Sequence, residues 1–321
     1  MGVSAKTARH RCVPALCLAR RCPRKASPLP SPDLKLGLIC ACAIIFIWSG
    51  FIVFSRAGVV AGLTAYDVAA LRFLVAGAFT LPFAWAWWPR DLPIGIQAMI
   101  ALTGPGAIYS VLTFVGLSNA SAAYGGVFTN GSLPIFTVLV MLAITGTAPR
   151  LGQIAAIAVI VAGGVLLGLH GMSAASDDVV TGIAMFLCAS AILSFYIFGV
   201  GHWKVSARGA LALVNIPNAV IFLPIWWFAL PSGMDQVDPM LIVAHGLFQG
   251  IGPGFLAVIL FAMTAYHLGP TLTSGFSAVV PATAALLAIP VLGEIPVMLE
   301  WAGIVTVSAG LALLVLMRRQ G

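Results

Sequence analysis

Apolar stretches of about 20 residues recur along this chain and are separated by short polar connections. Each is long enough to cross about 30 Å of hydrocarbon as a helix, and the runs do not alternate as barrel strands do. The pattern predicts an all-α integral membrane protein with ten transmembrane helices, near residues 36–57, 66–88, 94–116, 120–146, 151–170, 179–200, 209–230, 240–264, 270–292 and 297–317.

The two halves of the chain resemble each other at an offset of 147 residues. The offset pairs Pro134 with Pro281 and Gly163 with Gly310. Five spans per half is an odd number, so the second half crosses the membrane in the opposite sense, and we expect an inverted five-plus-five repeat. The expected parts are a basic, disordered cytoplasmic tail at 1–34, a first five-helix repeat at 35–172 and a second at 173–321.

Composition makes lipid the solvent for most of this chain. Hydrophobic residues make up 61% of the sequence and charged residues 8%, whereas a soluble domain carries about 25% charged residues. The 20 prolines and 34 glycines agree with this, because both residue types are more frequent in transmembrane helices than in soluble ones.

The net charge of +7 indicates membrane topology rather than a nucleic-acid partner. Eight of the 16 basic residues lie in the first 35 positions, and most of the others flank apolar stretches. By the positive-inside rule both termini are cytoplasmic, on the side of Arg90, Arg150, Lys204 and Arg208 and opposite Arg56. We expect a multi-pass protein of the bacterial cytoplasmic (inner) membrane that binds no nucleic acid.

The sequence shows no motif of soluble enzyme chemistry. Its six cysteines match no common zinc spacing, and it contains no H-E-x-x-H helix, G-x-S-x-G elbow or G-x-x-x-x-G-K-[ST] loop. We therefore expect no metal, no cofactor and no enzymatic activity, and ATP-driven pumping within this chain is excluded.

Pro134 and Pro281 lie near the middles of the fourth and ninth stretches. Each removes a backbone hydrogen bond and frees the carbonyl four residues earlier, which belongs to Asn130 or Ser277. Polar residues precede both prolines, and in the second case they include Ser274. An unpaired carbonyl in hydrocarbon needs a partner. Two interpretations stay open: a structural kink satisfied by adjacent helices, or a substrate site near the midplane.

Arg72 lies one or two turns inside the second stretch. A guanidinium at that depth is costly, so it faces the bundle interior or reaches back to the interface. Three interpretations follow: a structural or gating ion pair, direct contact with an anionic group of a substrate, or simple snorkelling.

Other polar and aromatic residues at membrane depth are candidates to line one central substrate cavity: Trp48, Tyr109, Tyr124, Asn218 and Gln249. For each of them the competing interpretation is an interhelical hydrogen bond. Proton coupling needs a titrating group inside the membrane, and the candidates for that role are Glu300 and His245.

The order of these features resembles that of an EamA-type member of the drug/metabolite transporter superfamily. The resemblance rests on IFIWSGF with Trp48, on LTAYDVAALRFLVAG with Arg72, on FVGLSNASAAYGGVF, and on VLGEIPVMLEWAGIVTVSAGLALL with Glu294. It covers residues 36–317. The first repeat departs from the pattern, because Thr145-Gly146-Thr147 stands where the acidic motif of the family would lie.

The resemblance implies ten helices in an inverted repeat and a secondary transporter of small metabolites such as amino acids, nucleobase-like compounds or drugs. Alternating access around a midplane cavity is the expected mechanism, and export is the expected direction. A multi-span membrane enzyme or assembly factor and a channel are the alternatives. The expected partners are a small-molecule substrate and the lipid bilayer, and a homodimer stays open.

Overall fold

The structure is a computed structural model that describes residues 33–173 and 177–318; within these ranges it describes no side chain of residues 170–173, 177, 265, 269–275, 277 or 318. The predicted tail at 1–34 therefore lies almost entirely outside the described residues, and so do the side chains of Ser274 and Ser277. The boundary predicted between the repeats falls beside residues 174–176, which are also outside them.

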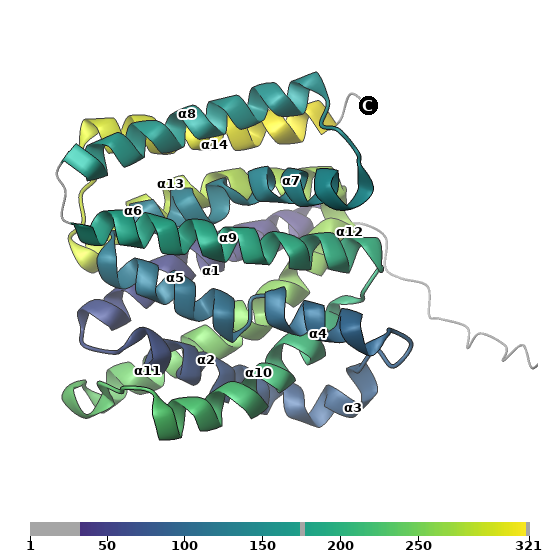
Figure 1. Cartoon of the computed structure of the whole chain (residues 1–321), viewed down its shortest axis with the longest axis vertical. Coiled ribbons are helices and arrows are strands. Elements are labelled where there is room, and N and C mark those ends of the chain that lie inside the picture. Colours follow the sequence, from purple (N-terminus) through teal and green to yellow (C-terminus); the bar gives the residue numbers. More distant parts are fainter. Residues whose placement is uncertain (1–32, 174–176, 319–321) are drawn as a thin grey trace, which may run out of the picture. The chain divides into compact units, whose positions relative to one another are not determined.

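The described part of the chain is helical and contains no strand (Figure 1). Its first half consists of Leu34–Val60 (α1), Ala65–Thr80 (α2), Leu81–Phe83 (η1), Ala84–Trp87 (α3), Ile94–Thr103 (α4), Ala107–Asn119 (α5), Ala122–Gly125 (α6), Gly126–Gly131 (η2), Leu133–Thr145 (α7) and Leu151–Ser173 (α8).

The second half consists of Asp177–His202 (α9), Ala207–Ala229 (α10), Met234–Gln236 (η3), Pro239–Ile251 (α11), Gly252–Leu256 (η4), Ala257–Phe276 (α12), Ser277–Val279 (η5), Val280–Leu292 (α13) and Met298–Arg318 (α14). Among the described residues, nine helices are long and apolar enough to cross a membrane, and the shorter Val280–Leu292 is a tenth apolar helix. This confirms the predicted all-α membrane fold.

Local sequence signals set several helix ends. Asp33 precedes α1, and its side chain accepts hydrogen bonds from the backbone amides of Lys35 and Leu36. Thr64 and Asp67 form a capping box at the start of α2, which satisfies amides that the first turn leaves without partners. α7 and α13 end in the same way as each other, at Gly146 and Gly293 with φ of 68° and 69°, a left-handed conformation that glycine adopts without strain. These two glycines are related by the offset of 147 residues.

Helix packing relates the two halves of the chain to each other. α5 packs on α9 as α12 packs on α1, and α7 packs on α9 as α13 packs on α1. Each of these contacts therefore has a counterpart in which the helices of the first repeat are replaced by the equivalent helices of the second, as the predicted repeat requires. The last helices of the two halves, α8 and α14, pack along each other and run side by side in Figure 1.

Glycines related by the repeat allow the close approach of α8 and α14. A methyl group on Gly163 would lie 2.7 Å from the amide nitrogen of Val307, and one on Gly310 would lie 2.9 Å from the amide nitrogen of Ile160. Such small residues let backbones come together in lipid, where the hydrophobic effect does not drive helices into contact.

Candidate functional site

The third and eighth spans are both interrupted near their middles by the tripeptide Gly-Pro-Gly. Gly104–Gly106 separates α4 from α5, and Gly252–Gly254 opens the π-helical segment η4 between α11 and α12. These two interruptions were not predicted from the sequence. The signal was present, because the two tripeptides repeat at an offset of 148 residues, one more than the offset that pairs the prolines.

Asn218 of α10 bridges the first of these breaks. Its Oδ1 accepts a hydrogen bond from the amide of Ala107 at 2.7 Å, and its Nδ2 donates to the carbonyls of Ala101 at 3.0 Å and Val214 at 2.7 Å. The amide group of Asn218, a predicted substrate contact, is thus occupied by backbone in this conformation. The structure shows the competing interpretation, an interhelical hydrogen bond.

Asn215 lies one turn earlier on α10 and serves the second break. Its buried Nδ2 donates to the carbonyl of Gly254 at 3.1 Å and to the hydroxyl of Thr80 at 2.9 Å. Unpaired backbone groups in hydrocarbon cost several kcal/mol each. One helix of the second repeat therefore stabilises the breaks of both repeats.

The fourth and ninth spans are interrupted just before Pro134 and Pro281, as predicted. The π-helical η2 precedes Pro134, and the 3₁₀ turn η5 precedes Pro281. The two interruptions meet, because a methyl group on Gly126 would lie 3.2 Å from the Cα of Pro281. The hydroxyl of Ser49 donates to the carbonyl of Val280 at 3.3 Å beside this crossing. Asn130, on η2, is half-buried, and its side chain takes part in none of the hydrogen bonds found among the described residues.

Arg72 is a buried cation within α2. Its side chain is 4% exposed, and the guanidinium carbon lies 5.2 Å from the ring centre of Phe51 and 5.9 Å from that of Phe73. Tyr109 is buried and close enough for electrostatic interaction with Arg72. Within the described part of the chain, Arg72 makes no hydrogen bond, and the ion pair found there is between Arg56 and Glu294. Neither snorkelling nor an ion pair therefore accounts for Arg72 in this conformation.

Gln249 and His245 lie one turn apart on α11, facing α1. Gln249 donates from Nε2 to the hydroxyl of Ser55 at 2.7 Å, and its Oε1 is buried without a partner. His245 is fully buried against Gly58, and neither ring nitrogen has a hydrogen-bond partner among the described residues. The two predicted residues form one polar strip between α1 and α11.

Tyr124 and Glu300 lie together in another place, between α6, α8 and α14. The hydroxyl of Tyr124 donates to the carbonyl of Leu167 at 3.3 Å and lies near the carboxylate of Glu300. Glu300 accepts from the amide of Val297 at 3.0 Å at the start of α14, which is a helix-capping contact. Trp48, by contrast, packs against Phe261 beside a cavity of about 10 Å³, which is the size of one water site.

The larger of the two cavities found is apolar, and Arg72 is not among its lining residues. It measures about 430 Å³ and lies between η2, α8 and α9, with Val307 of α14 in its wall. Its lining is aliphatic or aromatic apart from glycines and the hydroxyl of Ser132. Neither of the two cavities is lined by Arg72, Tyr109, Gln249 or Asn218. The predicted site residues are divided between the Arg72–Tyr109 group, the α1–α11 strip, and the Tyr124–Glu300 pair.

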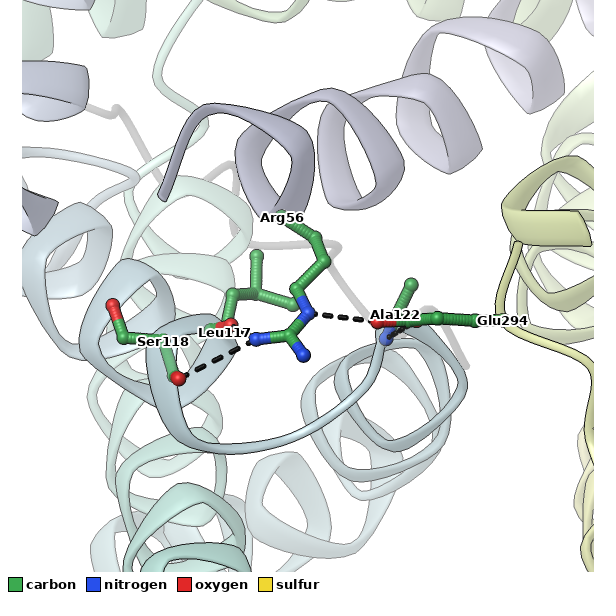
Figure 2. A network of polar contacts seen from close by, with 5 residues as sticks. All are labelled: Arg56, Leu117, Ser118, Ala122 and Glu294. Atoms are coloured by element: carbon green, nitrogen blue, oxygen red, sulfur yellow. Dashed lines mark hydrogen bonds and ion pairs between the residues drawn. The ribbon is translucent and has the colours of Figure 1, made fainter. Parts of the chain in front are cut away.

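A network of polar contacts ties the two repeats together at the end of the bundle where α1 ends (Figure 2). Arg56 Nε pairs with Glu294 Oε1 at 2.8 Å, and Arg56 Nη1 donates to the carbonyl of Leu117 at 2.6 Å. The second carboxylate oxygen of Glu294 accepts from the amide of Ala122 at 2.9 Å. We call this network the Arg56–Glu294 latch. It joins α1, α5 and α6 of the first repeat to the α13–α14 connection of the second.

A second network closes the same end. Asp67 is fully buried, and its carboxylate accepts hydrogen bonds at 2.9 Å from the indole of Trp226 and from the amides of Gly233 and Thr64. These contacts join α2 to α10 and to the connection that follows α10. The end of the bundle near residues 60–65 is thus held closed by two polar networks that cross between the repeats.

Comparison with known proteins finds a family to which the first half of the chain is similar. Residues 35–169 match the model of the EamA-like transporter family. No curated protein matches the sequence. A crystal structure of another protein superposes on this chain with a TM-score of 0.60 at 19% identity, covering 90% of this chain and 99% of that one. This likeness shows the fold alone, and it extends over both repeats.

Proposed function

Because residues 35–169 match the EamA-like transporter family, we propose that this chain is a secondary transporter that moves small metabolites by alternating access. The observation that carries the proposal is the inverted repeat whose third and eighth helices are both broken near their middles and joined through Asn215 and Asn218. Discontinuous helices at the interface of inverted repeats are how many secondary transporters build a substrate site.

The transport cycle requires the closed end of the bundle to open. In the described conformation the Arg56–Glu294 latch and the contacts of Asp67 hold that end together. Alternating access then means that both networks separate in the opposite state, while the other end closes. With both termini cytoplasmic, as proposed, the end held by these two networks faces away from the cytoplasm.

The proposed substrates are amino acids, nucleobase-like compounds or drugs, with export across the bacterial inner membrane as the proposed direction. The fold itself supports a multi-pass membrane protein. Proton coupling through His245 or Glu300 stays a prediction. His245 supports it better, because its ring is buried without partners whereas Glu300 caps its own helix.

Counterflow in proteoliposomes tests the proposed function. Vesicles are loaded with one unlabelled compound from a panel of amino acids, nucleobases and antibiotics, and the uptake of the same compound in labelled form is followed. A transient, saturable overshoot for at least one compound supports a carrier. Flux that rises linearly with concentration would indicate a channel, and recovery of a chemically altered label would indicate an enzyme.

A further inference from the structure

The environment of Arg72 lacks the anion that a buried guanidinium requires. Arg72 lies about 10 Å along α2 from its start at Ala65, since a helix rises about 1.5 Å per residue. Its Nε is buried with no acceptor, and no hydrogen bond or ion pair of the described residues reaches the rest of the guanidinium. Buried charges in folded proteins are paired, because removing the partner leaves an uncompensated charge in a medium of low polarity.

The acidic side chains nearest in sequence are occupied elsewhere. Asp67 precedes Arg72 by five residues, but its Oδ1 accepts from Trp226 and its Oδ2 from Thr64 and Gly233. Glu294 is paired with Arg56, and Glu300 accepts from the amide of Val297. The protein therefore supplies no counter-ion to Arg72 from these carboxylates, and the missing anion has to come from outside the chain.

Aromatic side chains lie around the guanidinium of Arg72. The rings of Phe51 and Phe73 face it at 5.2 and 5.9 Å, and a ring face attracts a cation without neutralising it. Tyr109 adds a buried phenol from α5 in electrostatic reach of the charge. Such a group of one cation, one hydroxyl and apolar walls fits a small molecule with an anionic end and an apolar body.

We propose that Arg72 binds the anionic group of the transported compound, a carboxylate or a phosphate, with the hydroxyl of Tyr109 as a second donor and the rings of Phe51 and Phe73 against its apolar part. The inference rests on the proposed function and narrows it. The proposed substrates are then organic anions and zwitterions such as amino acids. Neutral nucleobases and cationic drugs are excluded from the proposed substrates.

The first test compares binding of matched anionic and neutral compounds to the whole protein in lipid nanodiscs. The probes are L-phenylalanine and L-phenylalaninamide, benzoate and benzamide, and inorganic phosphate, and the readout is the midpoint of thermal unfolding at increasing probe concentration. We expect the anionic member of each pair to raise the midpoint at lower concentration than its amide. Stabilisation by phosphate alone would assign the anionic group to a phosphoester. Equal stabilisation by acids and amides would overturn the proposal.

Substitutions at Arg72 have a matched control in Arg90. Arg90 also faces an aromatic ring, Trp85 at 4.1 Å, but it is exposed and donates to the carbonyl of Trp85. We expect Arg72→Met to weaken binding of the anionic probe about 10- to 100-fold, because hydrogen bonds to a charged group contribute about that much. Arg90→Met should leave binding unchanged. Unaltered anion binding by Arg72→Met would contradict the assignment.

Stability without a probe separates a binding role from a structural one. Removing an unpaired buried charge should raise the unfolding midpoint of Arg72→Met above that of the wild type, whereas removing a structural arginine would lower it. Arg72→Gln provides a second variant should the thioether pack poorly. A fall of the midpoint in both variants would count against the proposal.

Counterflow of the same compounds distinguishes failure of this inference from failure of the proposed function. If a neutral compound shows overshoot and Arg72→Met does not reduce it, the proposed anion site is wrong, but the proposed carrier function stands. If anion binding depends on Arg72 but no compound shows overshoot, the proposed anion site stands, but the proposed carrier function is wrong.

Discussion

The two ends of the bundle are built from the same repeated elements, yet they are held together differently. Where α13 ends, Glu294 pairs with Arg56 at the end of α1. Where α7 ends, the residue at the equivalent position is Thr147, whose hydroxyl bonds to that of Thr145 in the same turn. Lys204 follows α9 as Arg56 ends α1, and it is exposed. Duplication thus preserved the scaffold and left the ionic contact at one end only.

In the proposed transport cycle, this difference between the two ends favours one of the two conformational states over the other. In a strictly symmetric repeat the inward-open and outward-open states would have the same energy. The Arg56–Glu294 latch adds charge-assisted hydrogen bonds to one end, and such bonds contribute about 1.5–3 kcal/mol each when partly buried. Under the proposed alternating access, the state closed at that end is favoured until the latch is broken, and the middle of the bundle is the part that both states share.

The largest expected effect comes from disturbing that shared middle. Replacing both Asn215 and Asn218 by leucine leaves backbone groups at both Gly-Pro-Gly breaks without partners. At about 1–3 kcal/mol for each unpaired buried group, we expect the free energy of unfolding to fall by about 5 kcal/mol and both ends to loosen together. Thermal unfolding in detergent micelles measures the loss.

Asn119→Leu is the control for this pair, because Asn119 donates only to the carbonyl of Val115 at the end of its own helix. We expect it to cost less than about 1 kcal/mol. Equal losses for Asn119→Leu and the double variant would show that the bridging role of α10 is not what stabilises the breaks.

Breaking the latch should open one end without disturbing the other. We expect Glu294→Gln to raise the rate at which a membrane-impermeant maleimide labels a cysteine placed at the buried Ser110, in a chain otherwise without cysteine. The rise should be about 10- to 100-fold, since that is the change in open population that a loss of about 1.5–3 kcal/mol produces.

Glu300→Gln serves as the matched substitution, because Glu300 caps the start of α14 and takes no part in the Arg56–Glu294 latch. Its labelling rate should stay within about threefold of that of the parent. A Glu294→Gln rate no higher than that of Glu300→Gln would show that the latch does not hold the end closed.

A weaker effect is expected when the missing acid is added to the other end. Thr147→Glu places a carboxylate at the position equivalent to Glu294, on the side of Lys204 and Arg150. Exposed ion pairs contribute about 0.2–1 kcal/mol. We therefore expect the added acid to enhance the labelling produced by Glu294→Gln by no more than about fivefold, by favouring closure of its own end. Thr147→Gln, measured in parallel, separates charge from size.

The smallest effect should come from salt. The side chains of the latch are 20% and 22% exposed, so counter-ions reach them only in part. Raising the ionic strength from about 0.1 to 1 M shortens the Debye length from about 10 to 3 Å. We expect labelling of the parent to increase less than threefold and that of Glu294→Gln to remain unchanged. A larger response in Glu294→Gln would place the salt-sensitive contact elsewhere.

Much of the fold could be predicted because its signals are local and repeated. Span length, the prolines at 134 and 281 and the glycines at 146 and 293 each act within one turn of helix. The Gly-Pro-Gly tripeptides were missed although they are equally local, because their offset differs by one residue from that of the prolines. A search that tolerates a shift of one residue finds both.

The site could be predicted less well, because its contacts join distant parts of the chain. Asn218 was expected to face substrate, and its partners lie more than 100 residues away at Ala101 and Ala107. Glu294 looks like a solvated loop residue in the sequence, and only the fold brings it to Arg56. Residue type alone indicated that burying Arg72 in the membrane is costly. Its lack of a counter-ion could not be predicted, because it depends on the direction in which the carboxylate of Asp67 points.

Distances measured across both ends of the bundle test alternating access most directly. Spin labels at Ser118 and Asp235 report the latched end, and labels at Arg90 and Thr147 report the other; all four residues are exposed. In nanodiscs, Glu294→Gln should lengthen the first distance and shorten the second in the same population of molecules. Lengthening of both distances together, or no change in either, would contradict alternating access between two repeats that open at one end as they close at the other.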